Sequence, residues 1–316
     1  MDKISFKDKK VVVTGASGVI GRELLRYLME EDATILTVDR LPLPDENWRN
    51  IEHVQKDIAT EDLQEVIDFN PEVIFHLAAA FERSAESPDF WNVNWHDNVL
   101  VSHNIVDLAK DLPNLKTFIF ASSYLLYNTD LYMSKEEKDV HYLKETDKIN
   151  PRNLCGGAKF YTEKELKFIK ELFLQDLRVV NARIYRVYGR GSKDIVSRWV
   201  RMCLNNEKLD VYNENNQFDY VFAGDVAKGL LELAKSPEAE GIVNLATGTP
   251  NSVNTLLNNL MEEGILDESN IVNHGVTEEF EASCADITKL KEVTGWHPET
   301  DFKNGIKKII EYETKK

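Results

Sequence analysis

Short apolar runs alternate with longer amphipathic stretches over the first two thirds of this chain. The short runs have the length of buried strands, whereas apolar residues in the longer stretches recur at the spacing of one helix face. Because parallel strands need crossover connections, this alternation predicts an α/β fold with a doubly wound parallel sheet of the Rossmann type. We expect strands over 10–14, 33–39, 51–56, 72–77, 116–122 and 178–184, and helices over 19–30, 61–69, 96–111 and 156–175.

After Arg183 the alternation loosens and the segments become shorter. A turn rich in glycine at 189–191 is followed by a mixture of helical and strand patterns. We therefore predict a dinucleotide-binding sheet domain over 1–182 and a smaller α/β lobe for the substrate over 183–316, from which a strand could return to the main sheet. The expected elements are helices near 194–205 and 225–235, and strands near 209–212, 219–223 and 242–246.

The first strand runs directly into three glycines, Gly15, Gly18 and Gly21, which open the first helix. A pyrophosphate bound at a helix N-terminus needs backbone N–H groups close by, and glycine lets the backbone approach it. The second strand ends in an acid, Asp39, at the spacing expected for a ribose contact. The pattern predicts a site for NAD or NADP, with a bare glycine turn as the alternative. The residues expected to cradle the pyrophosphate are Gly15, Ser17, Gly18, Val19, Ile20 and Gly21.

The composition narrows the class of protein. The chain has 316 residues, of which 42% are hydrophobic, and a formal net charge of −16. This acidity argues against nucleic acid and anionic membranes as partners, because both are bound chiefly through excess Lys and Arg. No apolar run has the length of a membrane span, and the first ten residues lack the apolar stretch of a signal peptide. The cysteines Cys155, Cys203 and Cys284 are too few and scattered for a disulfide framework, so we expect a cytoplasmic protein.

Motifs along most of the chain, from residue 9 to about residue 300, occur in one recognisable order. Each is common by itself, whereas their order and spacing are specific. Together they resemble the extended short-chain dehydrogenase/reductases of the NAD-dependent sugar epimerase/dehydratase family. The motifs are Thr14 to Gly21, Asp39, Asp57 with Ile58, His76 to Ala79, Asn98 with Asn104, Ala121 to Tyr127, Glu145 and Asp147 before Pro151, Val187 to Gly189, Asp219 to Val221, Asp225, and Gly295 to Pro298.

The resemblance implies that NAD is the cofactor. Asp39 is then the acceptor for the ribose hydroxyls of the adenosine half, and a carboxylate there repels a 2′-phosphate, which favours NAD over NADP. The neighbouring Arg40 is a group that could receive such a phosphate. Asp57 is similar to the family acid that contacts the adenine amino group, with a solvated surface carboxylate as the alternative. The remaining residues placed beside the cofactor are Ile58, Leu77, Ala78, Ala79 and Lys159.

Hydride transfer from a sugar carbon to the nicotinamide needs a base that removes the hydroxyl proton. In the family this base is the tyrosine of a Tyr-x-x-x-Lys pair, and a Ser or Thr on the preceding strand binds the substrate oxygen. Ser123 stands at the Ser/Thr position and Lys159 at the lysine position, but Cys155 takes the place of the tyrosine. The Tyr-x-x-x-Lys spacing occurs only at Tyr312 and Lys316, at the end of the given sequence and away from these motifs.

Three interpretations of this departure stay open. Cys155 could be the base, because a thiol ionises near pH ~8.5 and a lysine cation beside it lowers that value. Tyr124, directly after Ser123, could replace the missing phenol. The site could also have lost its redox step and bind NAD for another purpose, with Cys155 as a small buried filler. We favour Tyr124 acting with Ser123 and Lys159.

A second set of departures concerns the substrate. The dehydratase branch of the family places Asp-Glu after the Ser/Thr, whereas Tyr124-Leu125 stands here, which disfavours 4,6-dehydration. Nucleotide-sugar members bind the diphosphate with an Arg before the Asp-Tyr pair, and this position is Phe218. A further family arginine, expected about ten residues before Asp286, is missing from the acidic run 277–281.

Arg186 could compensate, because it occupies a family position that contacts the substrate and guanidinium groups donate in parallel pairs to phosphates. Arg190, Arg198 and Arg201 follow on the segment that resembles the nucleotide-facing part of the family, with ordinary surface positions as the alternative for the last two. We expect Phe81, Ser123, Arg186, Arg190 and Phe218 to contact the substrate.

We predict an oxidoreductase or epimerase that transfers hydride from a sugar hydroxyl, preferably of a nucleotide sugar, to bound NAD. An NAD-binding protein with an altered site, and a redox enzyme for a non-nucleotide polyol, stay open. No metal site is expected, since His96 and His103 have no ligand pattern around them. The helices 96–111 and 156–175 match those through which family members pair, so the resemblance implies a homodimer.

Overall fold

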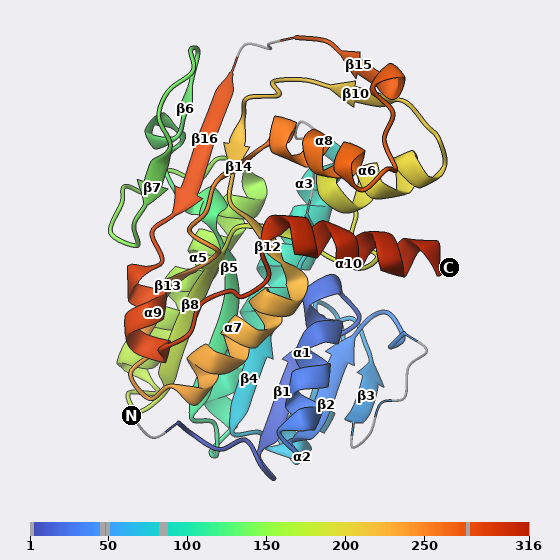
Figure 1. The fold of residues 1–316 in the computed structure, drawn as a ribbon. Helices are drawn as coiled ribbons and strands as arrows, with labels where there is room; N and C mark the ends of the chain where they lie inside the picture. The colour runs from blue at the N-terminus through green and yellow to red at the C-terminus, as the bar shows by residue number, and fades with distance from the viewer. Residues whose placement is uncertain (1–2, 45–47, 49–50, 82–87, 276–278, 316) are drawn as a thin grey trace.

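The computed structural model describes residues 3–44, 48, 51–81, 88–275 and 279–315. Within these residues, seven parallel strands form the central sheet in the order β13-β8-β5-β4-β1-β2-β3 (Figure 1). The order reverses direction beside β1, so the prediction of a doubly wound parallel sheet is confirmed. The strands are β1 (Lys10–Thr14), β2 (Thr34–Asp39), β3 (Ile51–Gln55), β4 (Val73–His76), β5 (Thr117–Ser123), β8 (Arg178–Ile184) and β13 (Gly241–Leu245).

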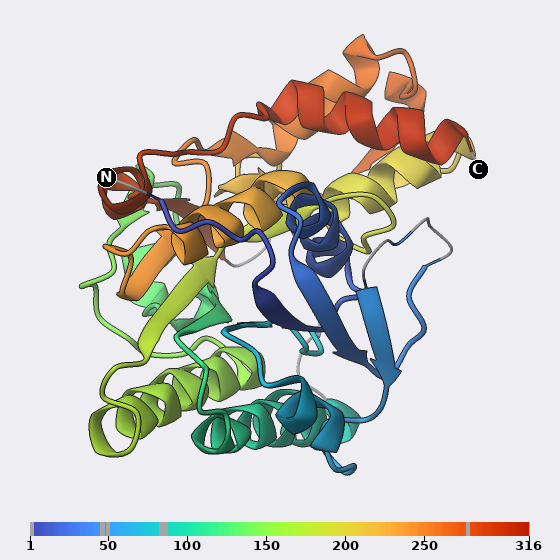
Figure 2. The same ribbon diagram turned by 90° about the horizontal axis from the view of Figure 1, so that it is seen from below.

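Helices cover both faces of the sheet, and Figure 2 shows them as two layers. Because both faces are covered, strands inside the sheet contain apolar runs, as in Val11-Val-Val13, whose side chains are fully buried. Leucines at helical spacing, Leu24, Leu25 and Leu28, bury one helix against the sheet. The helices on that face are α1 (Val19–Glu30) and α7 (Ala223–Lys235), and those on the other are α2 (Gln64–Phe69), α4 (Val101–Leu108) and α5 (Leu154–Leu172).

The predicted continuous helix over 96–111 is wrong in its bounds and geometry. The structure has α3 (Pro88–Asn94), a π-helical turn (Trp95–Leu100), α4, and a 3₁₀ turn (Ala109–Asp111). A π turn is wider than an α turn, and such turns occur often at functional sites. It places two consecutive polar residues, Asp97 and Asn98, in buried positions. A pattern search at the α-helical period does not detect such a turn.

The second part of the chain is divided between the sheet and a smaller lobe. β13 pairs with β8 in parallel, so the strand predicted near 242–246 does return to the main sheet. The strand predicted over 219–223 is two short strands. The other elements are β6 (Met133–Ser134), β7 (His141–Leu143), β9 (Arg186–Tyr188), α6 (Ile195–Leu204), β10 (Leu209–Val211), β11 (Gln217–Phe218), β12 (Tyr220–Phe222), β14 (Asn251–Ser252), α8 (Val253–Glu262), β15 (Ile271–Asn273), β16 (Phe280–Ala285), α9 (Thr288–Thr294) and α10 (Phe302–Thr314).

A buried carboxylate fastens the lobe to the sheet. Asp219 accepts hydrogen bonds from the backbone N–H groups of Thr247 at 2.9 Å, Gly248 at 2.8 Å and Ala285 at 3.2 Å. These donors lie just after β13 and at the end of β16, so one side chain joins segments that are far apart in the sequence. Burial raises the pKa of Asp219, and the hydrogen bonds oppose that rise. The Asp-Tyr motif therefore has an architectural role in this chain.

Candidate active site

A cleft lies at the carboxyl ends of β1, β2 and β4, which is where open α/β sheets bind ligands. The strand ends and the glycine turn before α1 line it, together with Asp97 from the π-helical turn and Val101 from α4. Most of the residues predicted to bind the cofactor line it, together with Leu41, Lys56, Asp97 and Val101, which the sequence analysis did not single out. The lining consists of Gly15, Ser17, Gly18, Asp39, Arg40, Leu41, Lys56, Asp57, Ile58, Leu77, Ala78, Ala79, Asp97 and Val101.

The glycine turn fits a closely approaching ligand. Gly15 has a φ of +71°, and a Cβ there would lie 2.6 Å from the backbone nitrogen of Ala78. A Cβ on Gly21 would lie 2.4 Å from the carbonyl oxygen of Gly15. Val19, Ile20 and Gly21 form the first turn of α1 and are not part of the cleft lining. Side chains larger than hydrogen would close the turn, so its shape suits a pyrophosphate at the N-terminus of α1.

Asp39 lies at the end of β2, where a ribose acceptor is expected. Its carboxylate accepts the backbone N–H groups of Ser17 and Leu41, each at 3.0 Å. These bonds fix the carboxylate on the cleft wall, next to the turn that approaches the ligand. The contacts fit the predicted ribose role.

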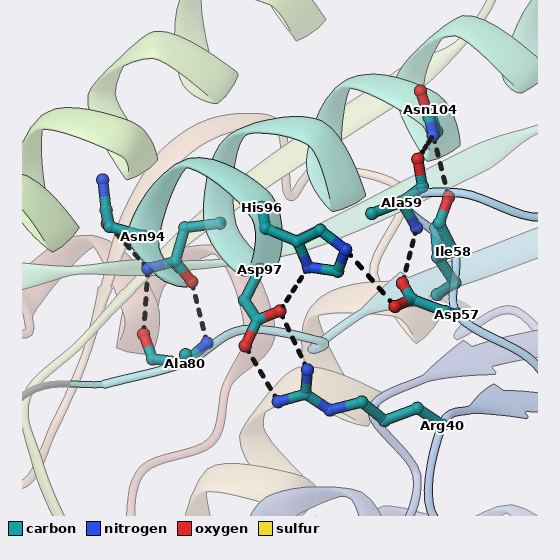
Figure 3. A network of polar contacts seen from close by, with 10 residues as sticks. Arg40, Asp57, Ile58, Ala59, Ala80, Asn94, His96, Asp97 and Asn104 are labelled. Atoms are coloured by element: carbon teal, nitrogen blue, oxygen red, sulfur yellow. Dashed lines mark hydrogen bonds and ion pairs between the residues drawn. The ribbon is translucent and has the colours of Figure 1, made fainter. Parts of the chain in front are cut away.

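An unpredicted polar network lies at the same end of the cleft (Figure 3). The guanidinium of Arg40 donates to both carboxylate oxygens of Asp97, at 2.9 and 2.8 Å. His96 lies between Asp97, at 2.7 Å, and Asp57, at 3.3 Å. Farther along the same run of helix, Asn98 exchanges two hydrogen bonds with the backbone of Ala80. Three of these side chains come from the π-helical turn, which the sequence pattern did not reveal.

Cys155 and Lys159 lie one turn apart at the start of α5. Asn153 caps this helix by accepting the N–H of Gly156 at 2.8 Å. A Cβ on Gly156 would lie 2.6 Å from the carbonyl oxygen of Leu125, so the glycine lets the helix approach the turn after β5. The Cys155 side chain is buried and its sulfur lies 3.8 Å from the carbonyl oxygen of Ala80, next to the cleft.

Lys159 is a buried cation whose pKa is lowered toward neutral pH. Its side chain is buried, with Nζ 4.7 Å from the centre of the Phe120 ring. Burial lowers the pKa of Lys159 to about 8, and the nearby thiol of Cys155 opposes this shift. His76 behind it stays neutral, because burial and the charge of Lys159 lower the pKa of His76 to about 3. A lysine with such a pKa can both hold and release a proton near neutral pH.

Ser123 ends β5 and Tyr124 begins the 3₁₀ turn that follows it, and the two side chains have different partners. The Ser123 hydroxyl accepts the N–H of Leu125 at 3.2 Å. The Tyr124 ring is buried and stacks on Tyr185 at 4.9 Å, and its hydroxyl lies 3.4 Å from Glu281. Burial raises the pKa of Tyr124 to about 12. The phenol therefore faces an acidic group and is difficult to ionise, which does not favour Tyr124 as a base.

Arg186 belongs to a cluster with Arg152 and Glu281. The Glu281 carboxylate accepts hydrogen bonds from Arg152 at 2.7 Å and Arg186 at 3.2 Å. Although burial alone raises the pKa of a carboxyl, the two arginines hold the pKa of Glu281 below its ordinary value. The guanidinium of Arg186 also lies 3.7 Å from the centre of the Phe218 ring. Two guanidiniums share one carboxylate, so the cluster keeps an excess positive charge.

The other expected substrate residues lie apart from this cluster. Arg190 pairs with Glu23 of α1 at 2.6 Å, and Arg201 pairs with Glu313 of α10 at 3.0 Å. Arg198 is exposed. Phe81 is 62% exposed at the edge of the described part of the chain. Thr277 and Glu278, in the acidic run where the family arginine is missing, lie outside the described residues.

Sequence reasoning missed the partners of Arg186. Arg152 lies in the segment that carries Cys155 and Lys159, and Glu281 in the acidic run, but 129 positions separate the two. A pairing at that distance gives no local signal. Glu281 was expected to repel a diphosphate, whereas the structure uses its charge to hold two arginines together.

The model of the NAD dependent epimerase/dehydratase family matches residues 11–246 of this chain. The chain belongs to this family. The family is NAD dependent, so the predicted family and its cofactor are confirmed. The match covers every strand of the central sheet except the start of β1.

Relatives of known name cover almost the whole chain. A putative UDP-glucose 4-epimerase of Methanocaldococcus jannaschii is 30% identical over 96% of this chain and 97% of that protein. The CDP-abequose synthase of Salmonella muenchen is 25% identical, with 96% and 97% of the two chains covered. Among solved structures, the UDP-glucose 4-epimerase of Thermotoga maritima with UDP-glucose has a TM-score of 0.81, at 25% identity and 97% and 99% coverage. MoeE5, in complex with UDP-glucuronic acid and NAD, shares the fold with a TM-score of 0.82 at 24% identity, covering 97% and 99%.

The described part of the chain has neither a metal site nor a membrane-spanning helix. Among the residues that the structure describes, no group of His, Cys, Asp or Glu side chains could hold a metal ion. His103 pairs with Glu165 of α5 and His96 with two aspartates, so neither belongs to such a group. In the described part of the chain, no helix is both long and apolar enough to cross a membrane.

Proposed function

We propose that this chain is an NAD-dependent enzyme of the epimerase type, which oxidises a hydroxyl group of a nucleotide sugar while the sugar stays bound. The observation that carries the proposal is the pair formed by Cys155 and Lys159, beside a cleft shaped for a dinucleotide. NAD, when bound, accepts the hydride from the sugar carbon. The protein must then take the hydroxyl proton and hold the sugar in place.

We assign the proton transfer to Cys155 and Lys159 acting as a pair. Two coupled groups lose their protons in two steps, and the pKa of each step belongs to the pair and not to one residue. Once the first proton is lost, the pair can act as a base for the sugar hydroxyl. The pKa of Lys159, lowered to about 8 by burial, puts that loss near the physiological range. The Tyr124 phenol, with a pKa raised to about 12 by burial, is ionised much less readily. The contacts favour the pair over Tyr124, which becomes a wall of the sugar site.

A nucleotide sugar is the proposed substrate because of the cluster of Arg152, Glu281 and Arg186. Its excess positive charge and partly exposed guanidiniums suit a diphosphate, which binds well to paired N–H donors. In the described part of the chain, the buried Nε of Arg186 and the hydroxyls of Tyr132 and Tyr220 have no hydrogen-bond partner. Buried polar groups are normally satisfied, so these are candidates for contacts with sugar and phosphate oxygens.

The alternative is a protein that binds NAD without turnover, and the replacement of the family tyrosine by Cys155 favours it. Both functions predict NAD binding, so only the turnover of a sugar substrate distinguishes them. A third possibility is a redox enzyme for a polyol without a nucleotide. For such an enzyme, the arginine cluster would bind a substrate without a diphosphate.

We also propose a homodimer that forms through α3 and α5. Large apolar side chains are exposed along these neighbouring helices. Two of them, one in α3 and one in the π-helical turn, are four residues apart and so lie on one helix face. Three more, at positions 161, 168 and 172, are exposed on α5. Exposed patches of this kind mark interaction sites. The side chains are Trp91, Trp95, Tyr161, Phe168 and Leu172, with exposed fractions of 64%, 57%, 49%, 57% and 67%.

The free cysteines are buried, and we propose the cytoplasm as the compartment.

One experiment separates the functions. The purified protein is offered NAD with UDP-glucose, UDP-glucuronate, a CDP-hexose or free glucose, and melting shifts, absorbance at ~340 nm and the sugar products by NMR are recorded. The proposal predicts stabilisation by a nucleotide sugar, none by free glucose, and an epimeric or oxidised product. Stabilisation by NAD alone, with no product from any sugar, would favour the protein without turnover. Turnover of a free polyol only would favour the third possibility.

A further inference from the structure

We propose that Asp97 makes this enzyme select NAD over NADP by holding the guanidinium of Arg40 away from the 2′ position of the adenosine ribose. The inference rests on the proposed placing of the adenosine half beside Asp39. It assigns a positioning role to Asp97, which no sequence motif indicated.

Arg40 is placed where it could serve NADP. It follows Asp39 directly at the end of β2, and both residues line the cleft. In dinucleotide-binding folds, an acid at this point binds the ribose hydroxyl of NAD, whereas an arginine nearby accommodates the 2′-phosphate of NADP. The chain carries both groups side by side, so the acid alone does not settle which cofactor binds.

The structure shows what occupies Arg40 instead. Asp97 receives two parallel hydrogen bonds from its guanidinium, at 2.9 and 2.8 Å (Figure 3). This fork-to-fork geometry is the strongest that an arginine makes with a carboxylate, and it uses the donors that a phosphate would need. The Asp97 side chain is only 10% exposed, whereas that of Arg40 is 56% exposed. A buried carboxylate therefore holds a more exposed guanidinium.

The surroundings of Asp97 keep it in this position. The π-helical turn Trp95–Leu100 brings its side chain into the cleft wall. The Nδ1–H of His96 donates to the same carboxylate at 2.7 Å, and the other ring nitrogen lies 3.3 Å from Asp57. The carboxylate is thus held from two sides, by Arg40 and by His96.

The charges at this end of the cleft also oppose a phosphate. Asp39, Asp57 and Asp97 all line it, and Arg40 is already paired. The other lining cation, Lys56, has its ammonium on Glu65 at 2.8 Å. A 2′-phosphate would meet three carboxylates and two cations that are engaged elsewhere. Neutralisation of Asp97 would free the guanidinium of Arg40 and remove one of the three negative charges.

The test measures equilibrium binding of NAD and NADP by calorimetry to the wild type, Asp97→Asn, Arg40→Ala and the double variant. Asp97→Asn keeps the shape of the side chain but removes its charge. We expect it to raise the affinity for NADP relative to NAD about tenfold, the size of one charge-assisted hydrogen bond. The double variant should lose that gain, because Arg40 is the group that makes it. Asp107→Asn on α4, an exposed acid paired with Lys110, removes the same charge elsewhere and should leave the ratio unchanged.

Each other result overturns the inference. A gain of equal size in the double variant would mean that Asp97 acts by repulsion alone, without Arg40. No gain in Asp97→Asn, with NAD binding and the unfolding temperature retained, would mean that Arg40 cannot reach the phosphate. If Asp97→Asn does not fold, Arg40→Ala provides the test. A selective loss of NADP affinity in Arg40→Ala would show that Arg40 already contacts the phosphate in the wild type, so that Asp97 does not hold it away. Failure of the cofactor site itself would appear separately, as absent NAD binding in the wild type.

Discussion

The two ends of the ligand site are built in different ways. The adenosine end is assembled from consecutive strand ends, with Gly15, Asp39 and Asp57 following β1, β2 and β3 in order. The reaction end combines Cys155 on α5 with Arg186 on β9 and Glu281 on β16. The first end can be read from the chain because the fold itself brings its residues together. The second depends on pairings with Glu281 across 95 to 157 positions.

This difference explains where the chain departs from its family. The adenosine end keeps the glycine turn, because any Cβ on Gly15 meets the backbone of Ala78 and its φ is positive. At the reaction end a tyrosine is exchanged for Cys155 and a diphosphate arginine for Phe218, while Arg186 takes part in a new cluster. Backbone geometry limits which residues can stand at the adenosine end, whereas side-chain chemistry limits them at the reaction end. Changes at the reaction end should therefore alter rates and substrate binding, and changes at the adenosine end should alter cofactor choice.

The largest effect is expected at Lys159. Lys159→Arg keeps a positive charge that does not dissociate in the physiological range, so the pair with Cys155 cannot lose a proton from the lysine. We expect the rate of hydride transfer to fall by ~10²-fold or more, the scale of a lost acid–base group. The wild-type rate should rise with pH toward a plateau above about 8, because burial lowers the pKa of Lys159 to that value. The variant should show no such rise, and a rise of the same size in both would remove Lys159 from the proton transfer.

Arg186→Ala should weaken substrate binding by roughly 10-fold to 100-fold, the range for losing hydrogen bonds to a charged group. Glu281 would keep Arg152, so the fold should persist, and NAD binding should be unchanged. Melting shifts with UDP and with NAD measure the two effects separately. The matched control is Arg198→Ala, an exposed arginine on α6. An unchanged shift with UDP would refute the diphosphate role of the cluster.

Asp39→Ala should weaken NAD binding by about tenfold while changing NADP binding less, because it removes a ribose acceptor and also a charge that repels phosphate. The backbone N–H groups of Ser17 and Leu41 would lose their acceptor, so the unfolding temperature has to be recorded alongside. Calorimetric titrations with both cofactors measure the ratio. Equal losses for NAD and NADP would contradict the assignment of Asp39.

The smallest effect is expected at Tyr124. Tyr124→Phe removes only a hydroxyl that lies 3.4 Å from Glu281, and burial has raised the pKa of this phenol to about 12. We expect the rate of hydride transfer to stay within about threefold, as for a residue outside the proton transfer. Single-turnover kinetics provide the measurement. A loss of ~10²-fold would instead identify Tyr124 as the base.

The sequence alone predicted the sheet, the helices beside it and most of the residues that line the cleft at its strand ends. Those predictions depend on local patterns, such as the apolar run before Gly15 and the acid that ends β2. It failed over 96–111, because the π-helical turn that places Asp97 has no signature at the helical period. It also could not give the direction of the Tyr124 hydroxyl or the partner of Arg186, since both depend on Glu281 from a distant strand. Burial, which sets the pKa of Lys159, is likewise a property of the folded chain.

The central claim is that Cys155 and Lys159 together replace the family tyrosine in an active enzyme. The most direct test follows the reduction of bound NAD at ~340 nm after mixing with a nucleotide sugar that stabilises the protein, from pH 6 to pH 10. The wild type, Cys155→Ala and Tyr124→Phe are compared. We predict that Cys155→Ala loses ~10²-fold in rate and changes the pH profile, while Tyr124→Phe keeps both. Full activity in Cys155→Ala together with its loss in Tyr124→Phe would contradict the account.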